Sequence, residues 1–266
     1  MPRGYADLAR QIVIWLAFYF GYLAVRGLVD RNPTKAILNG IRVIDFEQRT
    51  MHHLFEQTAQ RVADSSHVLL TLAAWTYWNS EFTVIGLTLF FVYLRRHERF
   101  ARFRNTILLA NMIGLVGYVV MPTAPPWMFP GRGFVDGVNH ESGIGALANP
   151  YAAMPSLHAA DALIVGVCLF LACRRWYFKA LWALWPAWVW FCVLATANHY
   201  LFDVLAGIAV ALFAMFVISR IGGRRAFVAG ELIAMEHVAA EDARKRWTKI
   251  WKSLDRKSLR DWMPAK

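Results

Sequence analysis

The chain has 266 residues, of which 58% are hydrophobic, and it carries a formal net charge of +11. This composition is too apolar for an ordinary soluble domain, and several apolar runs approach the length that spans a membrane. The positive charge raises the question of nucleic-acid binding. The basic residues lie beside the apolar runs, however, so contact with anionic lipid headgroups explains them better, and we expect no nucleic-acid partner.

Six apolar runs predict six membrane-spanning helices. In chain order they are Ile12–Val29, His67–Leu94, Thr106–Met121, Leu157–Cys173, Leu181–Ala197 and Tyr200–Ser219. The second run is long, and Asn79 and Glu81 interrupt it, so it is either one tilted or kinked span or two short halves. One span is preferred, because two halves would break the alternation of the loops between the two sides of the membrane.

The distribution of charge orients the predicted bundle. An excess of Arg and Lys marks the segments Arg95–Arg104 and Arg174–Lys179 and the tail from Arg220. The positive-inside rule places these three segments on the cytoplasmic side. The segments Asp30–Asp64 and Pro122–Ser156 have no such excess, so they are predicted to face outward, and both termini are then cytoplasmic.

These patterns predict an all-α integral membrane protein with a six-transmembrane-helix bundle in a single catalytic domain, residues 1–222. An amphipathic pattern within Asp30–Asp64 predicts a helix on the outer membrane surface. Residues 223–266 predict a basic amphipathic cytoplasmic helix, with Trp247 and Trp251 among lysines. The compact chain favours a bacterial plasma membrane as the location.

Two short stretches, 41 residues apart, each carry a histidine at the edge of an apolar run. His158 lies at the outer start of the fourth predicted span, and His199 lies at the outer start of the sixth. Asp203 follows His199 by four residues, which is one helical turn and the same face. The topology was argued from other residues, so its agreement with these motifs predicts one shared site.

An imidazole held by a carboxylate and facing a second imidazole can attack phosphorus and protonate the leaving oxygen. In this prediction Asp203 accepts the Nδ1 proton of His199, which leaves Nε2 as the nucleophile. His158 then donates a proton to the departing alkoxide. We expect the two imidazoles to lie within about 10 Å of each other, since a wider separation removes the geometry of in-line transfer.

Four further residues are candidates for substrate binding. Ser156 lies at a predicted helix N-terminus, where the dipole and the unpaired amides favour phosphate. Asp161 follows His158 by three residues and either orients that ring, faces a polar cavity or makes a structural hydrogen bond. Trp127 follows a proline-rich exit and fits the interfacial belt or the wall of a lipid-entry groove. Arg132 is the basic residue of the outer segment before His158.

Three other interpretations of these residues compete with phosphotransfer. Two histidines and Asp203 could bind zinc, but His-x3-Asp is not a strong zinc spacing and further ligands would be needed, so no metal and no cofactor are expected. A non-catalytic lipid-binding scaffold is a second alternative, and the intact histidines argue against it. A transporter with Asn79, Glu81 and Asp161 as its relay is a third, and six spans without apparent inverted repeats argue against it.

These motifs resemble the type-2 phosphatidic acid phosphatase superfamily, whose active site uses a Pro-Ser-x-His element and a later His-x3-Asp element. Pro155–His158 and His199–Asp203 match these elements. The resemblance is closest to the aureobasidin-resistance branch, the inositol-phosphorylceramide-synthase-like proteins, through Pro122–Trp127, Met154–Ala159 and Asn198–Gly207. Two elements of the wider superfamily, Lys-x6-Arg-Pro and a Ser-Arg before the second histidine, have no counterpart in this sequence.

The resemblance implies a metal-independent phosphotransfer through a phosphohistidine, with His199 as nucleophile, Asp203 as its orienting residue and His158 as acid and base. Phosphatases of the superfamily pass the phosphoryl group to water, whereas synthases of this branch move a phospho-headgroup to a lipid hydroxyl. The expected function is transfer of an inositol-phosphate-type headgroup at the outer face, with lipid or polyprenyl phosphate hydrolysis as the alternative. The partners are then a phospholipid donor, a lipid-alcohol or water acceptor, and the membrane; the oligomeric state is not predicted.

Overall fold

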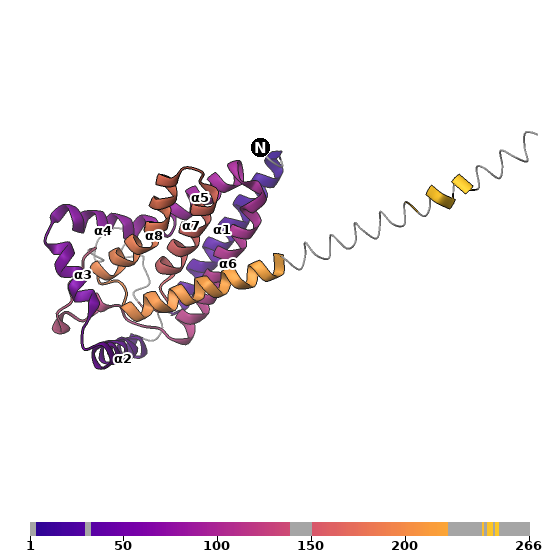
Figure 1. Ribbon diagram of the computed structural model, residues 1–266. Helices are drawn as coiled ribbons and strands as arrows, with labels where there is room; N and C mark the ends of the chain where they lie inside the picture. The colour runs from indigo at the N-terminus through magenta and orange to yellow at the C-terminus, as the bar shows by residue number, and fades with distance from the viewer. Residues whose placement is uncertain are drawn as a thin grey trace, which may run out of the picture. The chain divides into compact units, whose positions relative to one another are not determined.

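The computed structural model describes residues 4–29, 33–138 and 151–222, with residues 241, 244–246, 248 and 249 of the tail. The predicted cytoplasmic helix within residues 223–266 therefore lies largely outside the described residues. The described helices, labelled as in Figure 1, are α1 (Gly4–Val29), α2 (Pro33–Met51), α3 (Phe55–Asp64), α4 (His67–Ser80), α5 (Thr83–Arg95), α6 (His97–Val120), η1 (Pro126–Met128), η2 (Pro130–Arg132), α7 (Leu157–Ala172), α8 (Trp176–Ala195) and the Leu201–Gly222 helix.

Three of the described helices are long and apolar enough to cross a membrane, namely α6, α8 and the Leu201–Gly222 helix. Two shorter helices, α5 with 13 residues and α7 with 16, are also apolar. The all-helical architecture follows the prediction. The number of six spans stays a prediction.

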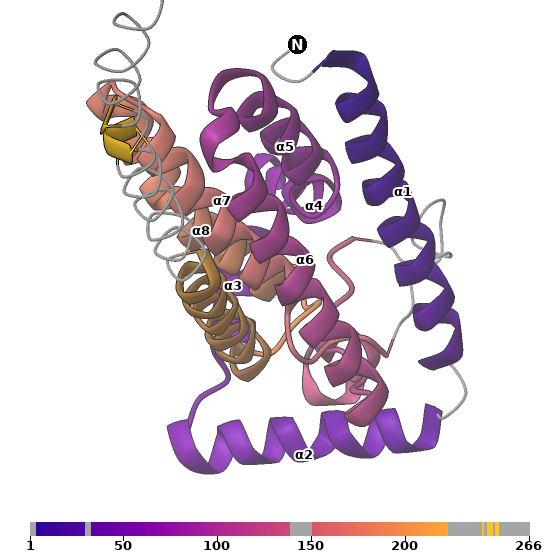
Figure 2. The same cartoon turned by 90° about the vertical axis from the view of Figure 1, so that its right-hand side faces the viewer.

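An apolar core joins α5, α6, α7 and the Leu201–Gly222 helix. Each contributes residues that are at most 2% exposed, among them Ile85, Ile107, Val165 and Ala211. α1 packs along α6, and Figure 2 shows the two helices side by side. Burial of these side chains holds the helices together and fixes the direction in which each presents its polar residues.

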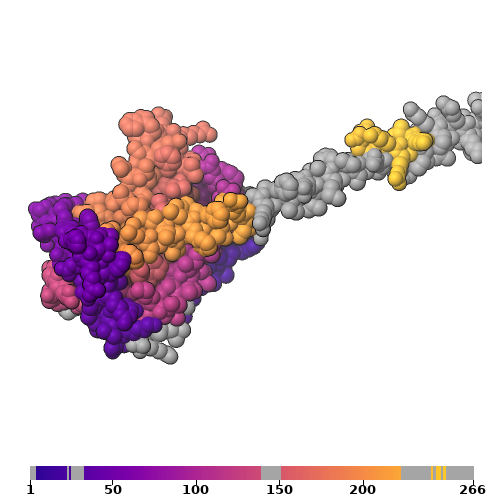
Figure 3. Space-filling view, turned by 60° about the horizontal axis from the view of Figure 1, so that its bottom comes forward, coloured from indigo at the N-terminus to yellow at the C-terminus, as the bar shows by residue number. Residues whose placement is uncertain are grey.

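α2 lies across one end of the bundle, at a steep angle to α1 and α6 (Figure 2). Its buried Ile44 packs in one cluster with Ala197 and Tyr200, which lie just before the Leu201–Gly222 helix. Figure 3 shows the surface of α2 beside the orange start of that helix, where the rings of Phe46 and Phe202 have centroids 5.1 Å apart. The outer amphipathic segment predicted within residues 30–64 therefore comprises two helices, α2 and α3.

The two ends of the bundle differ in chemistry. We call the end that carries α2, the turn 196–200 and the start of α7 the histidine end. The arginine end carries the α5–α6 and α7–α8 connections, where Arg96 and Arg99 donate hydrogen bonds to the carbonyl oxygens of Ala172 and Leu171. Because cationic side chains complement the negative end of a helix dipole, these contacts stabilise the last turn of α7.

The predicted span His67–Leu94 is not one straight helix: two helices, α4 and α5, meet there at Glu81, as in the kinked form of the single span. Beside the break, Asn79 donates to the carbonyl of Trp75, and Thr83 donates to the side chain of Asn79. Such local side-chain bonds compete with the helical hydrogen-bond ladder. α4 follows α3 at the histidine end and α5 ends at the arginine end, so the alternation of the loops survives the break.

Candidate active site

His199 lies in a tight, buried turn that joins α8 to the Leu201–Gly222 helix. Ala197 has a φ of 56°, the left-handed conformation that allows the chain to reverse direction. The amides of Asn198 and His199 both donate to the carbonyl of Val193, and the amide of Trp127 donates to the carbonyl of Ala197. These bonds hold the backbone of the turn, so the imidazole extends from a fixed position.

The tautomer of His199 is set by a backbone group. Its Nδ1 lies 2.8 Å from the carbonyl oxygen of Ala153. A carbonyl oxygen only accepts a hydrogen bond, so Nδ1 carries the proton and Nε2 carries the lone pair. Asp203 Oδ2 lies 3.6 Å from the same nitrogen, which is an ion-pair distance and longer than a hydrogen bond. Ala153 is thus a partner that the sequence did not predict.

Asp203 also connects the turn to the start of α7. Its Oδ2 accepts the amide proton of Tyr200 at 2.9 Å, and its backbone carbonyl accepts the amide proton of Ser156 at 3.0 Å. Among the described residues, its Oδ1 is buried without a hydrogen-bond partner. Tyr200 Oη donates to the carbonyl of Ala124 at 2.9 Å, so the proline-rich segment is tied to the same turn.

His158 is the second residue of α7, and the start of α7 touches the start of the Leu201–Gly222 helix. Ser156 is the N-cap, and its Oγ accepts the amide proton of Ala159 at 3.2 Å. Gly207 packs so closely on the carbonyl of Ser156 that a Cβ would overlap it. As a result, the ring centroids of His158 and His199 lie 5.6 Å apart, which confirms the predicted proximity.

Glu81 completes a second pair of a histidine and a carboxylate, which sequence reasoning missed. Its Oε2 lies 3.6 Å from Nε2 of His158, and both side chains are 11% exposed. Tyr77 stacks on the ring of His158 with centroids 4.5 Å apart, and Tyr22 Oη lies 3.5 Å from Oε1 of Glu81. The sequence did contain a signal for it, because an acidic residue within an apolar run indicates a functional role. That role was considered only as part of the relay of a transporter.

Two buried carboxyl groups from α2 and α3 hold the start of the Leu201–Gly222 helix. Glu56 accepts the amide proton of Leu201 at 2.5 Å, and Glu47 accepts that of Phe202 at 2.7 Å. Both residues are at most 1% exposed. Amides at a helix start have no partner within the helix, so these carboxyl groups satisfy them. Burial, together with the charge of Glu56, raises the pKa of Glu47 to about 9, so Glu47 is protonated at neutral pH.

Two of the predicted substrate-binding residues lie on or beside α7. Ser156 lies at the site, where its hydroxyl oxygen serves as the helix cap. Asp161 is 1% exposed, and its two carboxylate oxygens lie 2.9 and 3.1 Å from Nδ2 of Asn111 on α6. Of the three roles considered for Asp161, the structure shows the hydrogen bond within the bundle.

The other two predicted substrate-binding residues lie in the 3₁₀ helices η1 and η2. Trp127 is partly buried and packs against the apolar cluster formed by α2 and the His199 turn. The side chain of Arg132 is 47% exposed and pairs with Asp45 of α2 at 3.4 Å. It also lines a cavity of about 290 Å³ with residues of α2 and α3. Arg132 is therefore an exposed cation of the histidine end.

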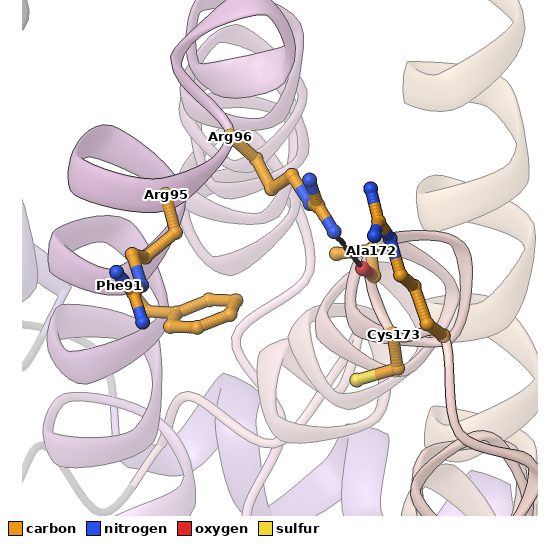
Figure 4. Close-up of a pocket in the computed structure, with 6 residues that line it drawn as sticks. Phe91, Arg95, Arg96, Ala172 and Cys173 are labelled. Atoms are coloured by element: carbon orange, nitrogen blue, oxygen red, sulfur yellow. Dashed lines mark hydrogen bonds between the residues drawn. The ribbon is translucent and has the colours of Figure 1, made fainter.

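A larger cavity, of about 480 Å³, lies at the arginine end (Figure 4). It is lined by Phe91, Arg95, Arg96, Ala172, Cys173 and Arg174. Figure 4 shows Arg96 extending to the carbonyl of Ala172 at the end of α7. α7 has 16 residues, so its two ends are about 24 Å apart at 1.5 Å per residue. This cavity is therefore remote from the two histidines.

The site combines an imidazole whose Nε2 carries a lone pair with a second imidazole beside a carboxylate. Such a pair can supply a nucleophile and a proton donor to one phosphorus centre. Within residues 4–29, 33–138 and 151–222, no group of three His, Cys, Asp or Glu side chains is placed to hold a metal ion. Fold and site together define a helical membrane protein in which two imidazoles face each other, each beside a carboxylate.

Comparison with known proteins identifies the family. Residues 42–217 match the model of the PAP2 superfamily, the type-2 phosphatidic acid phosphatases. This match covers more than half of the chain, so the protein belongs to the PAP2 superfamily, as its motifs predicted. It is an integral membrane protein of this family of lipid phosphate enzymes.

Two individual proteins are similar to the chain. Phosphoinositol dihydroceramide synthase from Bacteroides thetaiotaomicron is 31% identical over 193 residues, which are 65% of this chain and 59% of that protein. The chain thus spans about 59% of the length of this relative. The crystal structure of Aquifex aeolicus LpxE aligns with a TM-score of 0.48 and 14% identity, over 61% of this chain and 93% of that chain.

Proposed function

We propose that the protein transfers a phospho-headgroup from a phospholipid to the hydroxyl of a second lipid through a phosphohistidine at His199. The proposal rests on the pairing of two imidazoles, 5.6 Å apart, of which His199 is held with its lone pair on Nε2. The 31% identical relative is named a phosphoinositol dihydroceramide synthase. This name favours an inositol-phosphate headgroup and a ceramide-like acceptor.

In the first half of the reaction, the lone pair of His199 Nε2 attacks phosphorus. The bond from phosphorus to the lipid oxygen breaks, and His158 gives a proton to that oxygen, which leaves as an alcohol. The His199 ring gains positive charge when the N–P bond forms. The carboxylate of Asp203, 3.6 Å from Nδ1, stabilises that charge.

In the second half, the acceptor hydroxyl attacks phosphorus on the opposite side from the N–P bond. His158, now neutral, takes the proton of that hydroxyl, and the electrons of the N–P bond return to Nε2. Both residues thereby regain their starting states. With water in place of the lipid alcohol, the same steps would release the headgroup phosphate, which is the phosphatase alternative.

The phosphate requires donors to hold its oxygens. We propose that the first amides of α7 and the hydroxyl proton of Ser156 supply them, because a helix start favours negative charge. Arg132 is the proposed cation at this end, and Trp127 is the proposed wall along which lipid enters. Asp161, held by Asn111, is proposed to support the polar interior beside the site. A phosphodiester carries less charge than a phosphomonoester, which suits a site with few cations.

We further propose that the histidine end faces outward and that the termini are cytoplasmic. The arginine end gathers Arg95, Arg96 and Arg174 around one cavity, which suits the cytoplasmic side under the positive-inside rule. The start of α1 lies at the same end, because Asp7 accepts a hydrogen bond from Tyr93 at the end of α5. These contacts support an active site on the outer face.

The test uses purified protein in lipid nanodiscs with EDTA and a panel of labelled phospholipids and polyprenyl phosphates. Mass spectrometry follows the products with and without a lipid-alcohol acceptor. A new headgroup-bearing lipid that appears only with the acceptor supports the transferase, whereas free headgroup phosphate, or inorganic phosphate from a polyprenyl phosphate, supports the phosphatase. Either activity should vanish in His199→Ala and persist in His67→Ala, a matched change at an exposed histidine. Turnover that survives in His199→Ala would contradict the proposal.

A further inference from the structure

Glu81 occupies the break between α4 and α5, a place where the chain could have continued as one helix. The break directs its carboxylate toward α7, where Oε2 lies 3.6 Å from Nε2 of His158. Its other oxygen, Oε1, lies within 3.5 Å of Tyr22 Oη, a donor from α1. Side chains from α1, from the α4–α5 break and from α7 therefore meet around the carboxylate of Glu81.

A carboxylate inside a membrane-spanning bundle is costly to keep charged without a partner. Glu81 is 8% exposed as a residue, so water screens it little. A hydroxyl donor and an imidazole are the contacts that reduce this cost, and the contact with His158 is strongest when the imidazole is protonated. The charge of Glu81 thus favours the protonated form of His158.

The charged and titratable groups around His158 define its electrostatic surroundings. Glu81 faces the ring of His158 from the α4–α5 break, and Tyr77 stacks on it from α4. His199 faces the ring from the turn, and Asp203 lies next to His199. On α7 itself, Asp161 is engaged with Asn111. Each imidazole of the pair therefore has a carboxylate at 3.6 Å, Asp203 for His199 and Glu81 for His158.

We propose that Glu81 is the positioning residue that holds His158 as an imidazolium ready to protonate the leaving lipid oxygen. This inference rests on the proposed phosphotransfer by His199. Glu81 gives up and takes no proton in either half of the reaction. His158 gives one proton to the lipid oxygen as the P–O bond breaks and recovers one from the acceptor hydroxyl, so the proton count is unchanged after each turnover.

The test compares wild type with Glu81→Gln on two donors that differ in the leaving group. One is phosphatidylinositol, whose lipid alkoxide needs a proton; the other is inositol 4-nitrophenyl phosphate, whose 4-nitrophenolate leaves as a stable anion. The rate measured on each is that of leaving-group release in a single turnover without acceptor, so that only the first half of the reaction is followed. We expect this rate on the phospholipid to fall about 100- to 1,000-fold, within the usual contribution of a general acid. On the aryl analogue we expect a fall of less than about threefold.

The pH profile gives a second readout that a purely structural role would not change. In Glu81→Gln the imidazolium loses its negative neighbour, so the alkaline limb of the pH profile of this single-turnover rate on the phospholipid should move to lower pH. Glu98→Gln makes the same chemical change at an exposed position of the arginine end and should leave both readouts unchanged. Equal losses on both donors, or an alkaline limb that stays in place, would overturn the role of Glu81.

Failure of the proposed function has a different signature. If His199 is not the nucleophile, His199→Ala retains activity on both donors, whatever Glu81→Gln does. If His199→Ala removes both activities while Glu81→Gln shows no dependence on the leaving group, the phosphotransfer stands and only the role of Glu81 falls. The two variants together therefore separate the outcomes.

Discussion

The raised pKa of Glu47 makes the stability of the folded protein depend on pH. This residue is 1% exposed, accepts the amide proton of Phe202, and has its pKa raised to about 9 by burial and by Glu56. In the unfolded chain the same carboxyl group has its ordinary pKa of 4.5 and loses its proton near that pH. The folded state therefore binds more protons between these values, and its stability falls as the pH rises from about 4.5 to about 9.

The variant Glu47→Gln should remove this dependence. An amide is neutral, keeps an oxygen for the Phe202 amide, and presents N–H groups to Glu56. Keeping Glu47 protonated in the folded state costs about 1.36 kcal/mol for each pH unit above its ordinary pKa of 4.5. At pH 7 this cost is about 3 kcal/mol. Glu47→Gln is thus expected to stabilise the protein at pH 7 by up to about 3 kcal/mol, on the order of 5–10 °C in Tm.

The assay is thermal unfolding in detergent, followed by intrinsic tryptophan fluorescence between pH 5 and pH 9. The gain in Tm should grow with pH and nearly vanish at pH 5. Asp45→Asn is the matched control on the same helix; its carboxylate is exposed and pairs with Arg132, so its effect should stay below about 1 kcal/mol. A lower Tm for Glu47→Gln at pH 7, or an unchanged pH dependence, would show that Glu47 does not hold a costly proton in the folded state.

Two further predictions concern the contacts that hold the bundle around the site. Asn111→Leu leaves the buried carboxylate of Asp161 without its donor, so unfolding experiments should show a loss of about 2–3 kcal/mol; an unchanged Tm would contradict the importance of this bond. Gly207→Ala places a Cβ against the carbonyl of Ser156 and should lower kcat about 100-fold by displacing the start of α7. Gly86→Ala, in open space on α5, is its control, and equal activity of the two variants would count against that explanation.

The helical framework could be predicted from the sequence, because an apolar run long enough to span a membrane satisfies its backbone hydrogen bonds by forming a helix. The start of α7 at Leu157 was predicted at the correct residue. Asn79 and Glu81 predicted a tilt, a kink or a division of the run His67–Leu94, and a single span was preferred because two halves would break the alternation of the loops. In the structure α4 and α5 lead from one end of the bundle to the other, which the hydrophobic pattern could not distinguish from one continuous helix.

The proximity of His158 and His199 was also readable, because loop charge alone placed both on one side of the membrane. The groups that contact the site could not be predicted from the sequence. The carbonyl that fixes the tautomer of His199 belongs to the backbone of Ala153, and a backbone group leaves no signal in residue identity. Glu56 contacts the start of the last described long helix from 145 residues away, and sequence spacing reports only on partners within a few turns.

The phosphotransfer proposed for His199 passes through a covalent headgroup–phosphate intermediate, which rapid quenching can trap. Protein mixed with a donor labelled in the headgroup phosphate, without acceptor, is quenched at alkaline pH and digested. Mass spectrometry then locates the modified peptide. We expect an acid-labile headgroup phosphate on His199 that disappears when a lipid alcohol is added and never forms in His199→Ala. Turnover with the label absent from His199 at every quench time, or present on another residue, would contradict it.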